Sequence, residues 1–191
     1  ELSGVSGLNS EEVRKAFHDL EHLGVASNDA ALTAYVHAGV ERSSVKRFDK
    51  AAALESSLIA HLRVLAPDLA PDEPSYLHLR HATQALIDDE IADVNPAAIM
   101  QAIKALSRDG RGEDSGRGSL RVKRIDPDHV EVRLNRQWSD LEKTAGLRRD
   151  AARRILEQLI SSLPQGARGT DLLAETTMGK LASAVQQDAI L

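Results

Sequence analysis

The sequence contains no cysteine and few aromatic residues. Without cysteine the chain has no disulfide scaffold, no thiol nucleophile and no cysteine-ligated zinc site, which is typical of a cytoplasmic protein. Aromatic residues make up only 3% of the chain, so its core must be built from aliphatic side chains. Ala and Leu dominate that core, and together with Glu, Arg and Gln they favour helices over a large sheet.

The sequence also lacks any apolar run of the roughly 20 residues that a membrane-spanning helix needs. Its start, Glu1 to Gly4, has neither the basic nor the apolar region of a secretory signal, and it lacks an initiator Met. We therefore expect no membrane contact. We also expect the chain to be a fragment whose partners include the remainder of a parent polypeptide.

Charge is distributed unevenly along a chain whose net charge is −5. The acidic total argues against indiscriminate coating of nucleic acid. Between Lys104 and Arg154, however, the sequence has fourteen Lys and Arg against nine Asp and Glu. This basic segment predicts either a local anion-binding face or a face that docks on an acidic protein partner.

Apolar residues recur at helical spacing in several segments. The clearest helix start is Asn95-Pro96, an N-cap followed by proline at the first helical position. The pattern predicts helices over residues 10–23, 54–65, 76–88, 96–109, 138–163 and 172–191. The period changes to that of a strand over residues 32–36, where a short helix is the alternative, and over the hairpin 120–134 with its tip at Asp126-Pro127-Asp128.

Three helices followed by a hairpin is the element order of a winged helix-turn-helix domain. The first predicted helix and strand have the order of the last part of such a unit. We therefore predict a mainly α fold with a small β-hairpin. Its parts are a partial winged-helix unit at residues 1–42, a complete winged-helix domain at 43–137 and a helical extension at 138–191.

In winged-helix proteins the third helix usually enters the major groove, and the wing contacts phosphate or the minor groove. The third helix here offers few base-reading side chains, although Gln101 suits adenine and Arg108 suits guanine. The wing and its approaches are richer in cations, which suits contacts with the DNA backbone. The candidate DNA-binding residues are Gln101, Lys104, Arg108, Arg111, Arg117, Arg121, Lys123, Arg124, Arg133 and Arg136.

Alternation along the hairpin gives it one charged face, which carries Arg121, Lys123, Glu131 and Arg133. We interpret this face as binding phosphate, with a solvated surface and a protein-docking surface as the alternatives. A second basic cluster on the long helix is more typical of a solvated helix face than of a continued DNA track. It consists of Arg148, Arg149, Arg153 and Arg154.

No catalytic, cofactor-binding or metal-binding motif is present. His18 and His22 have the spacing of two zinc ligands on a helix, but no third ligand accompanies them, and the pair His78 and His81 is equally unsupported. The glycines that flank Arg111 and Arg117 precede a hairpin, so they are turn glycines rather than a phosphate-binding loop. Trp138 is expected to anchor the hairpin to the long helix.

Three sets of short strings carry a family resemblance: Leu32–Val36, Ser107–Gly112 with Gly118–Leu120, and Arg136–Trp138 leading to Arg148 and Arg149. They resemble the region after the motor of large bacterial RecQ-like superfamily 2 DNA helicases. The resemblance implies an ATP-dependent parent helicase whose motor, with its ATP and Mg, lies outside this chain. In that family an aromatic residue often forms a strand-separating wedge at the hairpin tip. The acidic tip here has none, and the chain has no zinc-binding cysteines.

The function predicted is that of an accessory region that grips duplex or fork DNA mainly through backbone contacts. The first alternative is a protein–protein docking module built on the same fold. The second is a transcriptional regulator, which needs a richer recognition helix and a dimer interface than this sequence displays.

Overall fold

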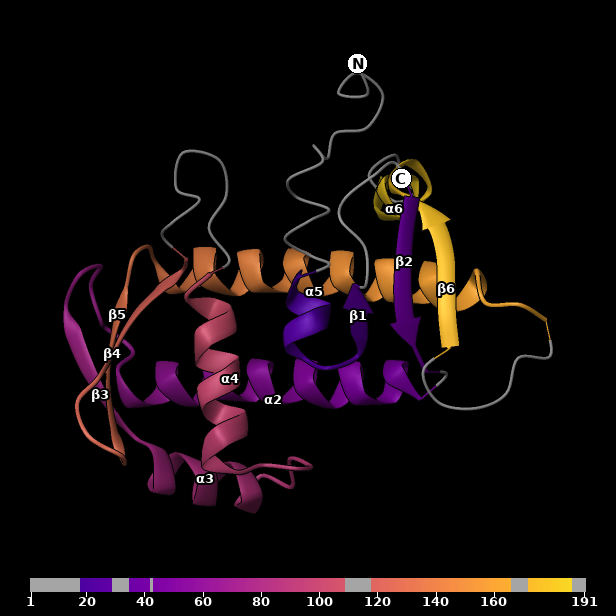
Figure 1. The fold of residues 1–191 in the computed structure, drawn as a ribbon. Helices are drawn as coiled ribbons and strands as arrows, with labels where there is room; N and C mark the ends of the chain where they lie inside the picture. Colours follow the sequence, from indigo (N-terminus) through magenta and orange to yellow (C-terminus); the bar gives the residue numbers. More distant parts are fainter. Residues whose placement is uncertain (1–17, 29–34, 42, 109–117, 166–171, 187–191) are drawn as a thin grey trace. The chain divides into compact units, whose positions relative to one another are not determined.

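The computed structural model describes residues 18–28, 35–41, 43–108, 118–165 and 172–186. These residues form a mixed α/β structure that is mainly helical and contains two small antiparallel sheets (Figure 1). The chain divides into two units. Unit 1 comprises Glu1–Asp49 and Arg148–Leu191, and unit 2 comprises Lys50–Leu147. Unit 1 thus joins two segments that the sequence analysis assigned to separate domains.

Unit 2 has the element order helix, strand, helix, helix, strand, strand, helix. It begins with the part of α2 (Ser44–Leu65) from Lys50 onward and ends with the part of α5 (Trp138–Ser161) up to Leu147. Between them lie β3 (Pro74–His78), α3 (Leu79–Asp88), α4 (Pro96–Leu106), β4 (Leu120–Arg124) and β5 (His129–Leu134). The predicted hairpin is confirmed as β4 and β5, and β3 is added beside β5 in the sheet order β3-β5-β4.

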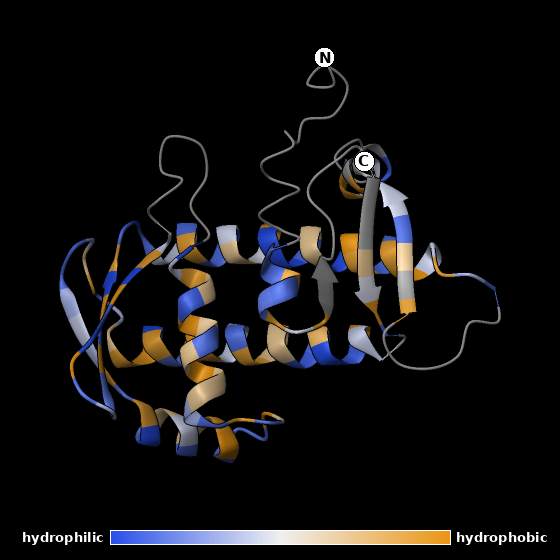
Figure 2. Ribbon diagram, viewed as in Figure 1, coloured by the Kyte–Doolittle hydropathy of each residue, from blue (hydrophilic) through white to orange (hydrophobic). Residues whose placement is uncertain are grey.

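Helix α4 begins where the sequence predicts. The Asn95 side-chain oxygen accepts a hydrogen bond from the amide of Ala98 at 2.9 Å, and Pro96 occupies the first turn. Proline is suited to this position because its missing N–H would have no partner within the helix. Figure 2 shows hydrophobic and hydrophilic residues both present along α4. Ile99 and Ile103 are fully buried in the core, which orients the helix.

Tyr76 to His78 form a strand, so the prediction of a helix from Tyr76 is wrong for these residues. Leu77 pairs with Val130 of β5, and its side chain is 1% exposed. Leu79 donates its amide to the carbonyl of Asp128 at 2.8 Å and starts α3. The strand depends on the hydrogen-bonding edge of β5, which lies far along the chain, and local spacing cannot reveal such a partner.

Unit 1 contains helical residues 18–22, β1 (Ala26–Asn28) and β2 (Tyr35–Val40). It also contains the part of α5 from Arg148 onward, β6 (Leu172–Thr177) and α6 (Met178–Gln186). The strand predicted over residues 32–36 is found at Tyr35 and Val36, while residues 32–34 lie outside the described part. The last predicted helix is wrong for Leu172–Thr177, because these residues pair with β2.

The two sheets share one arrangement. In unit 1 the order is β1-β2-β6, and in unit 2 it is β4-β5-β3, so each hairpin's second strand is central. The hairpins also share their register: Ala26 pairs with Val40, and Leu120 pairs with Leu134, 94 residues further along in both strands. The third strand precedes the hairpin in unit 2 and follows it in unit 1.

Candidate nucleic-acid interface

The three strands of unit 2 share one outward face. Arg121 pairs with Arg133 and Lys123 pairs with Glu131 across the hairpin, while β3 places Tyr76 opposite Glu131. Directly paired residues project to the same side of a sheet, and residues two apart on a strand do so as well. We call this side the outer sheet face. It comprises Pro74, Tyr76, His78, Arg121, Lys123, His129, Glu131 and Arg133.

Burial separates the two sides of this sheet. Val130 and Val132 of β5 are 0% and 2% exposed and pack into the core of unit 2. On the outer sheet face, Arg121 and Lys123 are exposed, and Tyr76 is 59% exposed. The core thus holds the inner side of the sheet and leaves the cationic side open to solvent.

Two of the cations on the outer sheet face have acidic neighbours. Arg133 Nε donates to Glu131 Oε1 at 2.7 Å, and Arg133 Nη1 donates to the Asp72 carbonyl at 2.8 Å. Arg121 lies 3.2 Å from the Asp72 carboxylate in a pair whose side chains are 56% and 70% exposed. Such an exposed pair contributes at most about 1 kcal/mol, so a phosphate can replace Asp72 at little cost. The Lys123 side chain makes no hydrogen bond or ion pair within the described part of the chain.

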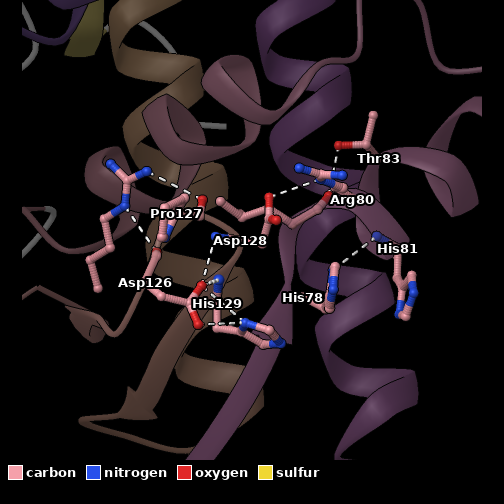
Figure 3. A network of polar contacts seen from close by, with 10 residues as sticks. His78, Arg80, His81, Thr83, Asp126, Pro127, Asp128 and His129 are labelled. Atoms are coloured by element: carbon pink, nitrogen blue, oxygen red, sulfur yellow. Dashed lines mark hydrogen bonds and ion pairs between the residues drawn. The ribbon is translucent and has the colours of Figure 1, made fainter.

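The hairpin tip is closed by Asp126 (Figure 3). Its Oδ1 accepts hydrogen bonds from the amides of Asp128 and His129, each at 2.8 Å. Arg124 donates to the carbonyls of Asp126 at 3.1 Å and Pro127 at 3.2 Å. Arg124 therefore supports the turn, and its guanidinium retains further donors for a ligand.

The pKa of Asp126 is lowered, first by the hydrogen bond from the Asp128 amide and then by the contacts with His129. Because the pKa is lowered, the ionised carboxylate stabilises the turn fully at pH values above the ordinary carboxyl pKa. This stabilisation is lost as the pH falls through the lowered pKa. We expect the amide signals of Asp128 and His129 to shift together on acidification in an NMR titration. An Asp126→Asn variant is the control. If its two amides shift in the same way, Asp126 is not the titrating group.

Three histidines connect the tip to the β3–α3 junction (Figure 3). The ring of His78 stacks on that of His81 at 4.0 Å between centroids and meets that of His129 edge-on at 4.5 Å. Arg80 adds an ion pair with Asp128 at 3.0 Å. The described residues contain no group of three or more side chains suited to a metal ion, and the pair His18 and His22 belongs to none.

The predicted residues of α4 lie on its exposed side. Gln101 and Lys104 are exposed, and so is Arg108 just beyond the helix. Arg108 and Arg136 each take part in an interaction within the protein. Arg111 and Arg117 lie outside the described residues.

The second basic cluster has partners inside unit 1. Arg148 lies 3.5 Å from Asp19 with only 12% of its side chain exposed, so the interpretation as a solvated face is wrong for this residue. Arg153 pairs with Asp49 and donates to Glu157, both at 2.9 Å, and Arg154 donates to the Val185 carbonyl at 3.1 Å. The contacts with Asp19, Asp49 and Val185 link segments of unit 1 that are distant in sequence, so we assign Arg148, Arg153 and Arg154 a structural role.

Trp138 is 7% exposed and donates from Nε1 to the Ala66 carbonyl at 3.1 Å. The tryptophan therefore ties the start of α5 to the residue that follows α2, and its burial excludes base stacking in this conformation. Sequence reasoning missed Tyr76 because it placed this residue in a helix. The signal was the alternation of buried Leu77 and Leu79 with Tyr76 and His78, which is typical of a strand.

No helix in the described ranges is both long and apolar enough to cross a membrane. The chain matches no model of a known protein family, no curated protein sequence and no solved structure in the comparisons made.

Proposed function

We propose that unit 2 is a winged-helix unit that binds duplex or fork DNA, mainly through the sugar-phosphate backbone. In this assignment α2, α3 and α4 are the three helices, β3 is the first strand, and β4 with β5 forms the wing. The element order and the sheet order β3-β5-β4 support the assignment. Helix α4 then corresponds to the helix that winged-helix proteins insert in the major groove.

The observation that carries the proposal is the outer sheet face. It gathers Arg121, Lys123 and Arg133 on one side of the wing, and the nearby Asp72 carboxylate is held only in an exposed ion pair. Such cations contact phosphates without reading sequence. Lys104 and Arg108 extend the basic set to α4, where the shortage of base-reading side chains also favours backbone contacts.

The helicase resemblance extends this proposal to the parent polypeptide. The chain would serve as the DNA-gripping accessory region of an ATP-dependent, RecQ-like helicase. Its ATP and Mg would bind to a motor outside this chain. No residue of unit 2 is assigned a role in ATP hydrolysis.

The test compares wild type with Arg121→Glu/Lys123→Glu on fluorescent duplex and forked DNA at several salt concentrations. The affinity falls as salt rises, and each lost phosphate contact makes the slope of log affinity against log salt shallower by about 1. The double variant is therefore expected to make the slope shallower by about 2. Arg133 is left in place because it holds Glu131 and the Asp72 carbonyl.

The matched control is Lys143→Glu/Lys180→Glu, which changes the net charge equally at two exposed positions on α5 and α6 rather than on the wing strands. It is expected to retain the wild-type slope. Equal losses in both double variants would mean that only net charge matters. Absence of DNA binding even at low salt would refute the DNA proposal and leave a docking module for an acidic protein.

A further inference from the structure

We propose that the outer sheet face binds single-stranded DNA, with an unpaired base stacked on Tyr76 and the flanking phosphates on the neighbouring cations. This inference deepens the proposed function and rests on it, because the same wing binds both strands of a fork. To the duplex contacts it adds Tyr76 as a binding residue, base stacking as a binding mode and single-stranded DNA as a ligand.

Tyr76 differs from the other aromatic residues whose burial the structure describes. Phe48 and Trp138 are 3% and 7% exposed and belong to hydrophobic cores, whereas Tyr76 is 59% exposed. Its neighbours in the strand, Ser75 and Leu77, face the inner side of the sheet. Burial in the core therefore does not account for the aromatic ring at position 76.

Two histidines share the outer sheet face with Tyr76. His78 follows on the same face two residues along β3, and His129 lies opposite His78 on β5. The rings of these two histidines meet at 4.5 Å, and His81 covers one side of His78 at 4.0 Å (Figure 3). Tyr76 thus shares its sheet face with the rings of His78 and His129, and its own exposed ring is a side chain on which a base can stack.

Cations lie at a distance that suits a nucleotide. Tyr76, Glu131 and Lys123 occupy one row across the three strands, so Tyr76 and Lys123 are about 10 Å apart at their backbones, which is two strand spacings. Arg133 and Arg121 form the adjacent row. A base on Tyr76 therefore brings its phosphates within reach of three long cationic side chains.

One carboxylate lies within this surface. Glu131 is between Tyr76 and Lys123, but its side chain is only 15% exposed, and Arg133 Nε donates to it at 2.7 Å. The Arg133 guanidinium offsets its charge, so Glu131 presents little repulsion to a phosphate above it.

The geometry favours a single strand over a duplex at this position. An aromatic side chain on a sheet face can stack only on a base whose own face is free, and base pairs inside a duplex have both faces covered by their neighbours. Strand β3 is also the edge of its sheet, with β5 as its partner in the described structure. A DNA strand leaving a fork can therefore reach Tyr76 from the unpaired edge of β3 and continue over β5 and β4 to the cations.

The experiment measures the binding of a short fluorescent oligo-dT and of a blunt duplex to the whole chain. Tyr76→Ala is expected to weaken oligo-dT binding by about 5- to 150-fold, the range of one base–aromatic stack, and to leave duplex binding unchanged. Tyr76→Phe keeps the ring and is expected to retain oligo-dT binding. The control is Ile87→Ala, which removes an apolar side chain of similar exposure, 47%, from α3.

A second measurement locates the contact directly. Oligo-dT carrying 5-iodouracil is irradiated with the wild-type protein, and mass spectrometry is expected to find the cross-link on Tyr76. Unchanged oligo-dT affinity in Tyr76→Ala, or a cross-link that avoids β3, overturns the inference and leaves duplex binding untouched. Conversely, if the protein does not bind duplex DNA but its oligo-dT binding still depends on Tyr76, only the proposed function is refuted.

Discussion

Replacing Gly118 by alanine is expected to destabilise unit 2 by about 3 kcal/mol, the upper part of the range for overpacked sites. An added Cβ would overlap the backbone of Ser107 and Arg108. Gly118 also donates its amide to the Ser107 carbonyl at 3.1 Å, and its own carbonyl accepts from Asn135 Nδ2 at 2.5 Å. The contact joins the end of α4 to the entry of β4, and backbone atoms cannot rotate away as a side chain can.

Urea unfolding followed by fluorescence tests this expectation, because Trp138 is the one tryptophan of the chain and lies in unit 2. Gly146→Ala is the matched control, since a Cβ at Gly146 meets no atom within 4 Å. Alanine is favoured over glycine within a helix, so this variant is expected to gain about 0.5–1 kcal/mol. Equal midpoints for Gly118→Ala and wild type would contradict the close contact.

Replacing Trp138 by alanine is expected to cost about 3–5 kcal/mol in the free energy of unfolding, because it leaves a large cavity in the core. The side chain packs with the hydrophobic cluster of unit 2, which includes Leu62 and Leu141. The variant also loses the Nε1 hydrogen bond to the Ala66 carbonyl. Both losses loosen the start of α5 from the end of α2.

Far-UV circular dichroism in urea follows the Trp138 variants, since they lack the fluorescent residue. Trp138→Phe separates the two contributions, because it fills most of the volume without the hydrogen bond. It is expected to cost about 1–2 kcal/mol, since the Ala66 carbonyl still accepts from the Leu69 amide at 3.2 Å. Similar losses in the Phe and Ala variants would show that the hydrogen bond outweighs the packing.

The part of the candidate site that lies within one hairpin could be predicted from the sequence. Alternation placed Arg121, Lys123 and Arg133 on one face, because strands joined by a short turn pair with each other. Tyr76 could not be predicted in the same way. It reaches this face only because β3 pairs with β5, which follows two helices and a further strand.

The sequence by itself determined the elements whose bonds are local. The hydrogen bonds of a helix connect residues four apart, so periodic apolar spacing and the cap at Asn95-Pro96 were enough for α4. The scarcity of aromatic residues likewise indicated an aliphatic core, and the absence of cysteine excluded disulfides. Tertiary structure alone decided that Pro74–His78 pairs with β5, that Leu172–Thr177 pairs with β2 and that both ends of the chain contribute to unit 1. A strand is stabilised by a partner that can lie anywhere along the chain, and local spacing carries no record of where that partner is.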